Sequence, residues 1–433
     1  MARGRTPLSP SIAITPRGPL NATIRPPGSK SITNRALVCA ALAAGRSTLS
    51  GALDSDDTRV MVDCLRKLGI AVDHSAEART LTVDGCGGRI SAREADLFVG
   101  NSGTTVRFLT ALVTLGRGVY RLDGVARMRE RPIEDQLDAL RQLGAKLTCE
   151  LGTGCPPVRV EANGLPGGKS RVRGDVSSQF LSGLLMTAPC ALSDVELSVD
   201  GVLVSQPYIH MTLAVMRSFG IAVEIAPDLS HFKIRGARRY EPREYAIEPD
   251  ASAASYFFGA AAIAGGQATV DGLSRQSLQG DIAFADVLAQ MGCDVEFDDV
   301  HNRTTVRSGA LHGTDVNMNA ISDTVQTLGA VALFADGPTT ITGVGHIRHK
   351  ETDRIAAMAT ELRKLGATVE EFADGMKITP GPLHGAAIDT YDDHRMAMSL
   401  ALAGLRIPGV VINDPGCTAK TYPEFFQDLA SLK

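Results

Sequence analysis

The chain has 433 residues, of which 44% are hydrophobic and 21% charged, and its formal net charge is -4 at pH 7. This length exceeds what a single hydrophobic core usually serves, so we expect two domains. A slightly acidic chain has no electrostatic reason to bind nucleic acid, and no uninterrupted apolar run is long enough to cross a membrane. The eight cysteines show neither CxxC pairs nor metal-ligand spacing, which favours reduced thiols in a cytoplasmic protein.

The first predicted helix lies in the stretch IRPPGSKSITNRALVCAALAAG, residues 24–45, where Lys30 and Arg35 stand near the start of an otherwise apolar segment. A P-loop is excluded, because Ser29 rather than glycine precedes the lysine. A helix N-terminus with added cations still favours an anion site. A solvated helix cap without a ligand is the simpler alternative.

Farther along the chain, five predicted amphipathic helices end alike in a glycine that is followed by an alternating strand pattern. These glycines are separated by 75, 76, 72 and 74 residues, and they are Gly69, Gly144, Gly220, Gly292 and Gly366. Each one predicts a helix C-cap. A sixth copy, YPEFFQDLASLK at residues 422–433, stops where its glycine would fall. The chain is therefore predicted to contain six repeats.

A second kind of helix occurs once in each repeat and is rich in small and apolar residues. Its six copies lie within residues 29–45, 100–116, 176–191, 250–266, 321–337 and 392–405. A helix that is apolar on all sides is a buried helix, whereas the amphipathic kind belongs on a surface. We expect an α/β fold with an N-terminal domain of residues 27–247 and a discontinuous domain of residues 1–26 plus 248–433.

Unusual polar residues gather at the N-terminal ends of these buried helices. They are Lys30, Ser31, Arg35, Asn101, Gly103, Arg107, Ser177, Ser178, Gln179, Asp323, His394 and Arg395. Predicted loops add Arg127, Arg131, Ser205, Tyr208, Lys350, Arg354 and Lys420. Each residue alone is explained by an ion pair, a cap or a core position. Their recurrence at equivalent repeat positions instead favours a site for a substrate with several anionic groups.

Several long motifs carry a resemblance to a known family: PGSKSITNRAL, GNSGTTVRFL, VSSQFLSGLLMTAP, KETDRI, YDDHRMAM and DPGCTAKTYP. At these motifs the chain resembles the enolpyruvyl transferases, and within them the branch that acts on shikimate 3-phosphate. The resemblance implies a two-domain fold, an inside-out α/β barrel of six βαβαββ repeats with three per domain, and an active site in the interdomain cleft.

Two alternatives stay open at this point. One is the branch that acts on UDP-N-acetylglucosamine, although the loop LDGVARMRERP at residues 122–132 lacks the cysteine that this branch usually carries. The other is a non-catalytic phosphosugar-binding protein of the same fold. Asp323 and Glu351 argue against it, because anion binding alone does not call for carboxylates.

The resemblance implies transfer of the enolpyruvyl group of phosphoenolpyruvate to the 5-hydroxyl of shikimate 3-phosphate by addition and elimination. Asp323 and Glu351 would be the proton acceptor and donor, with Lys30 as a third catalytic residue. The residues implied to bind shikimate 3-phosphate are Lys30, Ser31, Arg35, Ser177, Ser178, Gln179, Ser205, Asp323 and Lys350. Those implied to bind phosphoenolpyruvate are Lys30, Gly103, Arg127, Gln179, Arg354, Arg395 and Lys420.

The same resemblance implies a monomer that needs no metal or organic cofactor and that glyphosate inhibits. It implies no nucleic-acid or membrane partner. Two positions depart from the family pattern. His346 stands where asparagine is frequent, and Phe108 stands where proline is common.

Overall fold

The computed structural model describes residues 9–433, which form two compact units. The central unit is Gly28–Glu248, and the split unit joins Pro249–Lys433 to the N-terminal residues up to Pro27. No helix in residues 9–433 combines the length and the apolar character that a membrane crossing requires.

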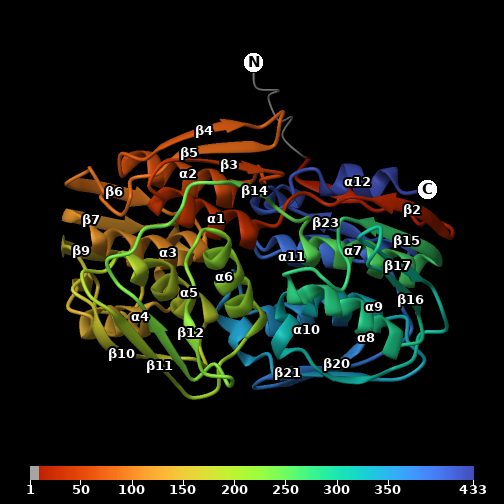
Figure 1. The fold of residues 1–433 in the computed structure, drawn as a ribbon. Coiled ribbons are helices and arrows are strands. Elements are labelled where there is room, and N and C mark those ends of the chain that lie inside the picture. The colour runs from red at the N-terminus through yellow and green to blue at the C-terminus, as the bar shows by residue number, and fades with distance from the viewer. Residues whose placement is uncertain (1–8) are drawn as a thin grey trace. The chain divides into compact units, whose positions relative to one another are not determined.

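The central unit contains two sets of three helices (Figure 1). The inner helices are α1 (Lys30–Leu42), α3 (Gly103–Leu112) and α5 (Ser178–Thr187). The outer helices are α2 (Asp56–Lys67), α4 (Glu134–Gln142) and α6 (Pro207–Ser218). Nearly every inner-helix residue is buried, whereas α2 buries one side and exposes charged residues on the other. Both predicted helix types are thus confirmed in this unit.

Three sheets with one topology complete the central unit, in the strand orders β14-β3-β5-β4, β6-β7-β9-β8 and β10-β11-β13-β12. Their bounds are β3 (Arg46–Ser50), β4 (Ala71–Ser75), β5 (Thr80–Asp84), β6 (Glu94–Phe98), β7 (Arg117–Asp123), β8 (Lys146–Cys149), β9 (Val158–Asn163), β10 (Gly168–Arg173), β11 (Val195–Asp200), β12 (Glu224–Ile225), β13 (His231–Ile234) and β14 (Glu244–Ala246). In each sheet the first two strands are parallel and the later pairs are antiparallel. In the β3–β5 register, buried Leu49 pairs with buried Leu81, so the alternating pattern turns one face of the sheet inward.

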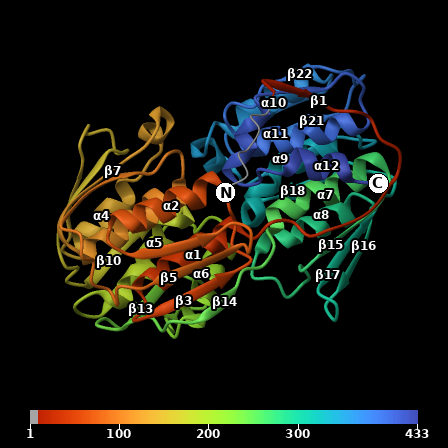
Figure 2. The same cartoon turned by 90° about the horizontal axis from the view of Figure 1, so that it is seen from above.

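The split unit repeats this plan, with inner helices that lie beside one another in Figures 1 and 2. Its inner helices are α7 (Ala251–Ala264), α9 (Val325–Ala332) and α11 (His394–Ala401), and its outer helices are α8 (Phe284–Gln290), α10 (Arg354–Lys364) and α12 (Phe425–Ser431). Its sheets have the orders β16-β17-β15-β2, β18-β19-β21-β20 and β1-β23-β22. The strand bounds are β1 (Ser11–Ala13), β2 (Leu20–Ile24), β15 (Gly266–Asp271), β16 (Asp294–Asp298), β17 (Arg303–Arg307), β18 (Asp315–Asn317), β19 (Thr339–Thr342), β20 (Thr368–Phe372), β21 (Gly375–Thr379), β22 (Ala387–Ile388) and β23 (Val411–Asn413). The N-terminal strands β1 and β2 complete sheets whose other strands come from residues beyond 265.

The five repeat glycines end outer helices in a left-handed conformation, with φ between +81° and +105°. After α2, the N–H of Gly69 donates to the carbonyl of Arg66, and the N–H of Ile70 donates to that of Leu65. This pair of bonds is the Schellman motif, and the same pair recurs at each of the other four glycines. The C-cap prediction is therefore confirmed, because glycine adopts this backbone conformation without a steric penalty.

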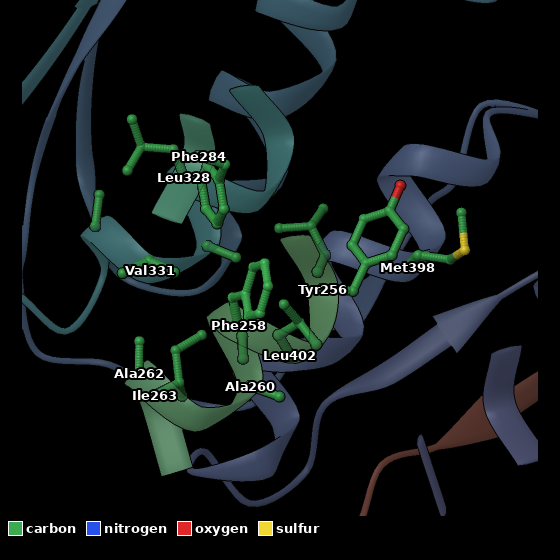
Figure 3. Close-up of a cluster of buried hydrophobic side chains, with 14 of the residues drawn as sticks. Tyr256, Phe258, Ala260, Ala262, Ile263, Phe284, Leu328, Val331, Met398 and Leu402 are labelled. Atoms are coloured by element: carbon green, nitrogen blue, oxygen red, sulfur yellow. The ribbon is translucent and has the colours of Figure 1, made fainter. Parts of the chain in front are cut away.

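The core of the split unit forms around α7, whose side chains are drawn with those of neighbouring elements in Figure 3. Phe258 and Ile263 of α7 belong to the same buried cluster as Leu328 and Val331 of α9. At Gly259 a Cβ would lie 3.0 Å from Thr327 Cγ2, so the absent side chain lets α7 and α9 approach closely. Tight packing of inner helices fixes where their N-termini lie, and the candidate site is built there.

Candidate active site

The inner helices of the central unit begin at the same end. Near the start of α1, the Asn34 amide donates a 2.7 Å hydrogen bond to Thr104 Oγ1, on the first turn of α3. Arg107 Nη1 donates a 2.8 Å bond to Gln179 Oε1, at the start of α5. The expected convergence of helix N-termini is thus confirmed in this unit, and their free N–H groups and dipoles favour an anion nearby.

Two predicted cations mark the start of α1. The hydroxyl of Ser29 caps the helix, and the ammonium of Lys30 lies 3.4 Å from Asp57 Oδ2. Arg35 is almost fully buried, and its Nε donates a 2.7 Å hydrogen bond to Thr212 Oγ1. Its guanidinium also lies 5.2 Å from the ring centre of Phe108. Burial lowers the pKa of Arg35 to about 10, so it stays a cation at neutral pH.

The predicted serines lie at helix starts. Ser177 is the N-cap of α5, and its hydroxyl accepts a 3.3 Å hydrogen bond from the N–H of Gln179. Ser178 is the first residue of that helix and is buried. Ser205 is buried just before α6 and has a positive φ of +53°. A non-glycine residue in this conformation is uncommon and marks a backbone position worth testing for function.

Gly103 begins α3 and is crowded by arginines. A Cβ at this position would collide with Arg131 and would lie 2.8 Å from Arg107 Nη1. Arg131 donates a 2.9 Å bond to the carbonyl of Asn101, which precedes the helix. The predicted Arg127 lies in a 3-10 turn, Ala126–Glu130, where it pairs with Glu130 at 2.7 Å. The start of α3 is therefore strongly cationic.

The second group of predicted residues lies in the split unit and centres on Asp323, in a 3-10 segment before α9. Asp323 Oδ2 accepts a 2.7 Å bond from Arg395 Nη2, and Oδ1 accepts a 3.3 Å bond from Arg354 Nη1. The ammonium of Lys350 lies 3.9 Å from the same carboxylate. Three cations that the sequence distributes over more than 45 residues thus face one carboxylate.

Arg354 links this carboxylate to a second one. Its Nη2 donates a 2.9 Å bond to Glu351 Oε2, and Lys420 Nζ lies 3.8 Å from Glu351 Oε1. Arg354 is 1% exposed. Burial would lower its pKa, but the carboxylates of Asp393, Glu351 and Asp323 outweigh burial and raise it. A guanidinium shared by two carboxylates fixes the orientation of both, which suits groups that exchange protons with one substrate.

Two acidic residues of this cluster were missed by the sequence reasoning. Asp393 is fully buried, caps α11, and accepts a 2.7 Å bond from Arg354 Nε. The sequence does contain a signal for Asp393, because this residue directly precedes the candidate residues His394 and Arg395 in the motif YDDHRMAM. Asp281 accepts a hydrogen bond from Ser252, and burial, with Asp323 nearby, raises its pKa to about 6. Nothing in the local sequence distinguishes Asp281.

His346 stands where the family frequently has asparagine, and its side chain is uncharged, as that of asparagine is. It is 8% exposed in a 3-10 turn, Gly345–His349. Burial, and secondly the neighbouring Lys350, lower its pKa to about 3. The imidazole is therefore neutral at physiological pH and can serve as an uncharged hydrogen-bonding group, as an asparagine does.

The predicted residues thus divide between the two units, and those of each unit are grouped under one name. The central cluster comprises Lys30, Ser31, Arg35, Gly103, Arg127, Ser177, Ser178, Gln179 and Ser205. The split cluster comprises Asp323, Lys350, Glu351, Arg354, Arg395 and Lys420. Within residues 9–433 no group of three or more His, Cys, Asp or Glu side chains is placed to hold a metal ion.

Comparison with known proteins identifies the family. A family model described as EPSP synthase (3-phosphoshikimate 1-carboxyvinyltransferase) matches residues 14–429. The chain belongs to the EPSP synthase family. A 3-phosphoshikimate 1-carboxyvinyltransferase from Trichormus variabilis is 52% identical over 408 residues, covering 94% of this chain and 95% of that protein. A chloroplastic relative of the same name from Arabidopsis thaliana is 49% identical, covering 97% of this chain and 84% of that protein.

Solved structures agree with this family and with the fold. An EPSP synthase from Acinetobacter baumannii superimposes with a TM-score of 0.78 at 26% identity, covering 96% of both chains. An enolpyruvyl transferase from Streptomyces tendae, at 20% identity, gives a TM-score of 0.76 over 98% of both chains and supports the fold alone. The expected enolpyruvyl transferase fold is confirmed. The branch that acts on UDP-N-acetylglucosamine is not favoured, because the family model and these close relatives carry the shikimate name.

Proposed function

We infer that this chain transfers the enolpyruvyl group of phosphoenolpyruvate to the 5-hydroxyl of shikimate 3-phosphate, in the shikimate pathway that leads to chorismate and the aromatic amino acids. Membership of the EPSP synthase family supports this activity. The observation that carries it within the molecule is the split cluster, where Asp323 and Glu351 share Arg354 among cations. A non-catalytic binding protein has no use for two oriented carboxylates there.

In the proposed reaction, the 5-hydroxyl oxygen attacks C2 of phosphoenolpyruvate, and Asp323 takes the hydroxyl proton. Glu351 gives a proton to C3, which becomes a methyl group in a tetrahedral intermediate. The methyl group then returns a proton, the C2–O bond to phosphate breaks, and phosphate leaves with the bonding electrons. Lys30 and the neighbouring cations stabilise the charge that develops on the leaving oxygen.

The two clusters would divide the substrates between them. The central cluster would bind mainly shikimate 3-phosphate, with Ser177, Ser178 and Ser205 on its phosphate and Lys30 shared between the ligands. Phosphoenolpyruvate would take Arg354, Arg395 and Lys420 of the split cluster, together with Gly103, Arg127 and Gln179. Its phosphate and carboxylate would compete with Asp323 and Glu351 for the same guanidinium groups, which frees these carboxylates for proton transfer. This division requires both clusters to reach one pair of substrates.

The activity is tested by release of inorganic phosphate from phosphoenolpyruvate by the purified chain with a chelator present. Phosphate should appear only when shikimate 3-phosphate is added. Turnover with UDP-N-acetylglucosamine in its place would assign the chain to the sister branch. Binding of shikimate 3-phosphate without turnover would instead support a binding protein.

We further propose that glyphosate competes with phosphoenolpyruvate beside Gly103. A methyl group at this position would displace Arg131 and Arg107, and Arg107 holds Gln179. Gly103→Ala should therefore raise the glyphosate inhibition constant by about tenfold or more, with a smaller rise in the KM for phosphoenolpyruvate, because the inhibitor is longer than the substrate. Equal inhibition constants for wild type and variant would place glyphosate elsewhere.

A monomer in the cytoplasm is the simplest state for this enzyme. All eight cysteines lie within residues 9–433 and carry free thiols, which supports a reducing compartment. The plant relative is named as chloroplastic, so the compartment depends on the source of the chain. Sedimentation equilibrium tests the monomer, and a mass twice that of the chain would overturn it.

A further inference from the structure

A cavity of about 740 Å³ opens in the central unit where the inner helices end, away from Lys30 at the start of α1. Leu115, from the 3-10 turn that follows α3, and Cys190, from the turn that follows α5, form part of its wall. Gly87 lines it as well, and its N–H donates to the carbonyl of Ala43 just beyond α1. The cavity therefore belongs to the opposite end of this unit's helices from the central cluster.

Arginines dominate the charged lining of this cavity. They are Arg89, Arg93, Arg117, Arg238 and Arg239, and the lining contains no aspartate or glutamate. Within residues 9–433 none of the five forms an ion pair or a side-chain hydrogen bond, whereas other arginines of the same unit, such as Arg46 and Arg121, pair with carboxylates. The five positive charges repel one another, so grouping them does not stabilise the folded chain. The grouping is also not a result of overall composition, because the net charge of the chain is -4.

The repeat fold does not require three of these arginines, Arg89, Arg238 and Arg239. In the central unit the segments after β5 and β13 read GCGGR (residues 85–89) and RGARR (residues 235–239). The equivalent segments after β17 and β21 of the split unit read SGALHG (residues 308–313) and PGPLHG (residues 380–385), without arginine. The β-sheets of the split unit thus form without arginine in this segment.

We propose that this cavity binds an organic di- or triphosphate. A guanidinium group donates two parallel hydrogen bonds to a phosphate, and five of them suit two or three phosphate groups. Leu192, which is 67% exposed, lines the same cavity with the half-buried Ile90, and these side chains give an apolar surface for the organic part of the ligand. Cys190 contributes no charge, because burial raises its pKa to about 12. Arg117 begins β7 and Asn163 ends β9, and these two lining residues are opposite partners in the antiparallel pair of strands, which lie side by side in Figure 1.

The test is isothermal titration of the whole chain with ATP as the probe and without divalent cations. ATP should bind with one site per chain, and its affinity should fall as salt is raised. Arg89→Gln with Arg239→Gln should weaken binding by about a hundredfold, at about tenfold for each charge-assisted contact. The control Arg171→Gln removes an exposed arginine of β10 that does not line the cavity, and its affinity should stay within twofold of wild type.

Three results would overturn the proposal. One is the absence of saturable ATP binding by the wild-type chain. Another is an equal loss in Arg171→Gln, which would reduce the effect to general surface charge. The third is an affinity that Arg395→Gln weakens and the cavity variants do not, since ATP would then occupy the split cluster. Titration with inorganic triphosphate distinguishes the contribution of the arginines from that of the apolar side chains. Equal affinity for inorganic triphosphate and for ATP would refute a role for the apolar surface.

Discussion

At the residue scale, the Glu351 carboxylate accepts a 2.9 Å hydrogen bond from the guanidinium of Arg354 and lies 3.8 Å from the ammonium of Lys420. Glu351→Gln keeps a hydrogen-bond acceptor for Arg354 but cannot donate the proton that the reaction requires. We expect kcat to fall by about a hundredfold or more, with the Kd for shikimate 3-phosphate changed by less than about threefold. Glu361→Gln is the matched control: Glu361 is buried on α10, accepts from Tyr391 and lies outside both clusters. Near-normal kcat in Glu351→Gln would remove Glu351 from the mechanism.

His346 gives a prediction about pH at the same scale. Its folded pKa of about 3 lies below the usual value of 6.5, so the unfolded chain takes up a proton between these values while the folded chain does not. Stability is therefore lost as pH falls through this window. His346→Asn removes this loss, so the drop in unfolding free energy between pH 6.5 and pH 5 should be smaller in the variant by roughly 1.5–2 kcal/mol.

Urea unfolding at the two pH values measures this drop for wild type and variant. His210→Asn replaces an exposed histidine and should leave the drop unchanged. Turnover of His346→Asn at neutral pH should stay close to wild type, because both side chains are uncharged there. A drop identical to that of wild type would show that His346 has the same pKa in the folded and unfolded chains.

At the scale of the element, the outer helices depend on their terminal glycines. Gly366, after α10, has φ +102°, and an added Cβ would collide with the carbonyl oxygen of Pro382. Gly409 also has a positive φ of +82°, but a Cβ there would only reach ordinary contact with Gly385, at 3.7 Å. Gly409→Ala should cost about 1 kcal/mol of backbone strain. Gly366→Ala should cost about 2–4 kcal/mol, because steric overlap adds to the strain.

Thermal and urea unfolding of the two glycine variants separate these contributions. The circular dichroism of both native proteins should match wild type, since the helices themselves are unchanged. Equal losses of stability in the two variants would show that the Pro382 carbonyl moves aside at little cost. In that case the glycine would be needed for its backbone conformation alone.

At the scale of the whole molecule, the chain passes between the two units at residues 27–28 and again at residues 248–249. Ser29 N–H donates to the carbonyl of Glu248, and Asp250 N–H donates to that of Pro27, each at 2.8 Å. The two passages therefore run side by side and can act as one hinge. We expect anionic substrate to favour closure about this hinge, because the cations of each cluster attract it.

Small-angle scattering with saturating shikimate 3-phosphate should show a smaller radius of gyration than the free chain does. Shikimate at the same concentration is the control, because it lacks the phosphate and should leave the radius unchanged. The prediction of ligand-driven closure would be wrong if the radius of gyration with each of the two compounds equalled that of the free chain while calorimetry showed that shikimate 3-phosphate was bound.

The sequence by itself determined the repeats, the two helix types, the glycine caps and the cationic helix starts. These features follow from patterns within one element, where periodicity reports burial and glycine reports a left-handed turn. Long motifs such as YDDHRMAM were also sufficient to indicate the family. Apart from the repeats, which follow from the regular spacing of similar segments, this information lies within stretches of about ten residues, so it can be read without knowing the fold.

The tertiary structure alone decided which side chains meet. Arg35 and Thr212 are 177 residues apart, and Arg354 and Asp393 are 39 apart, yet both pairs form buried 2.7 Å bonds. The neutral state of His346 likewise depends on its burial in the folded chain and on Lys350. Burial and electrostatic partners are properties of the packed molecule, because an environment assembled from distant segments sets the cost of a charge.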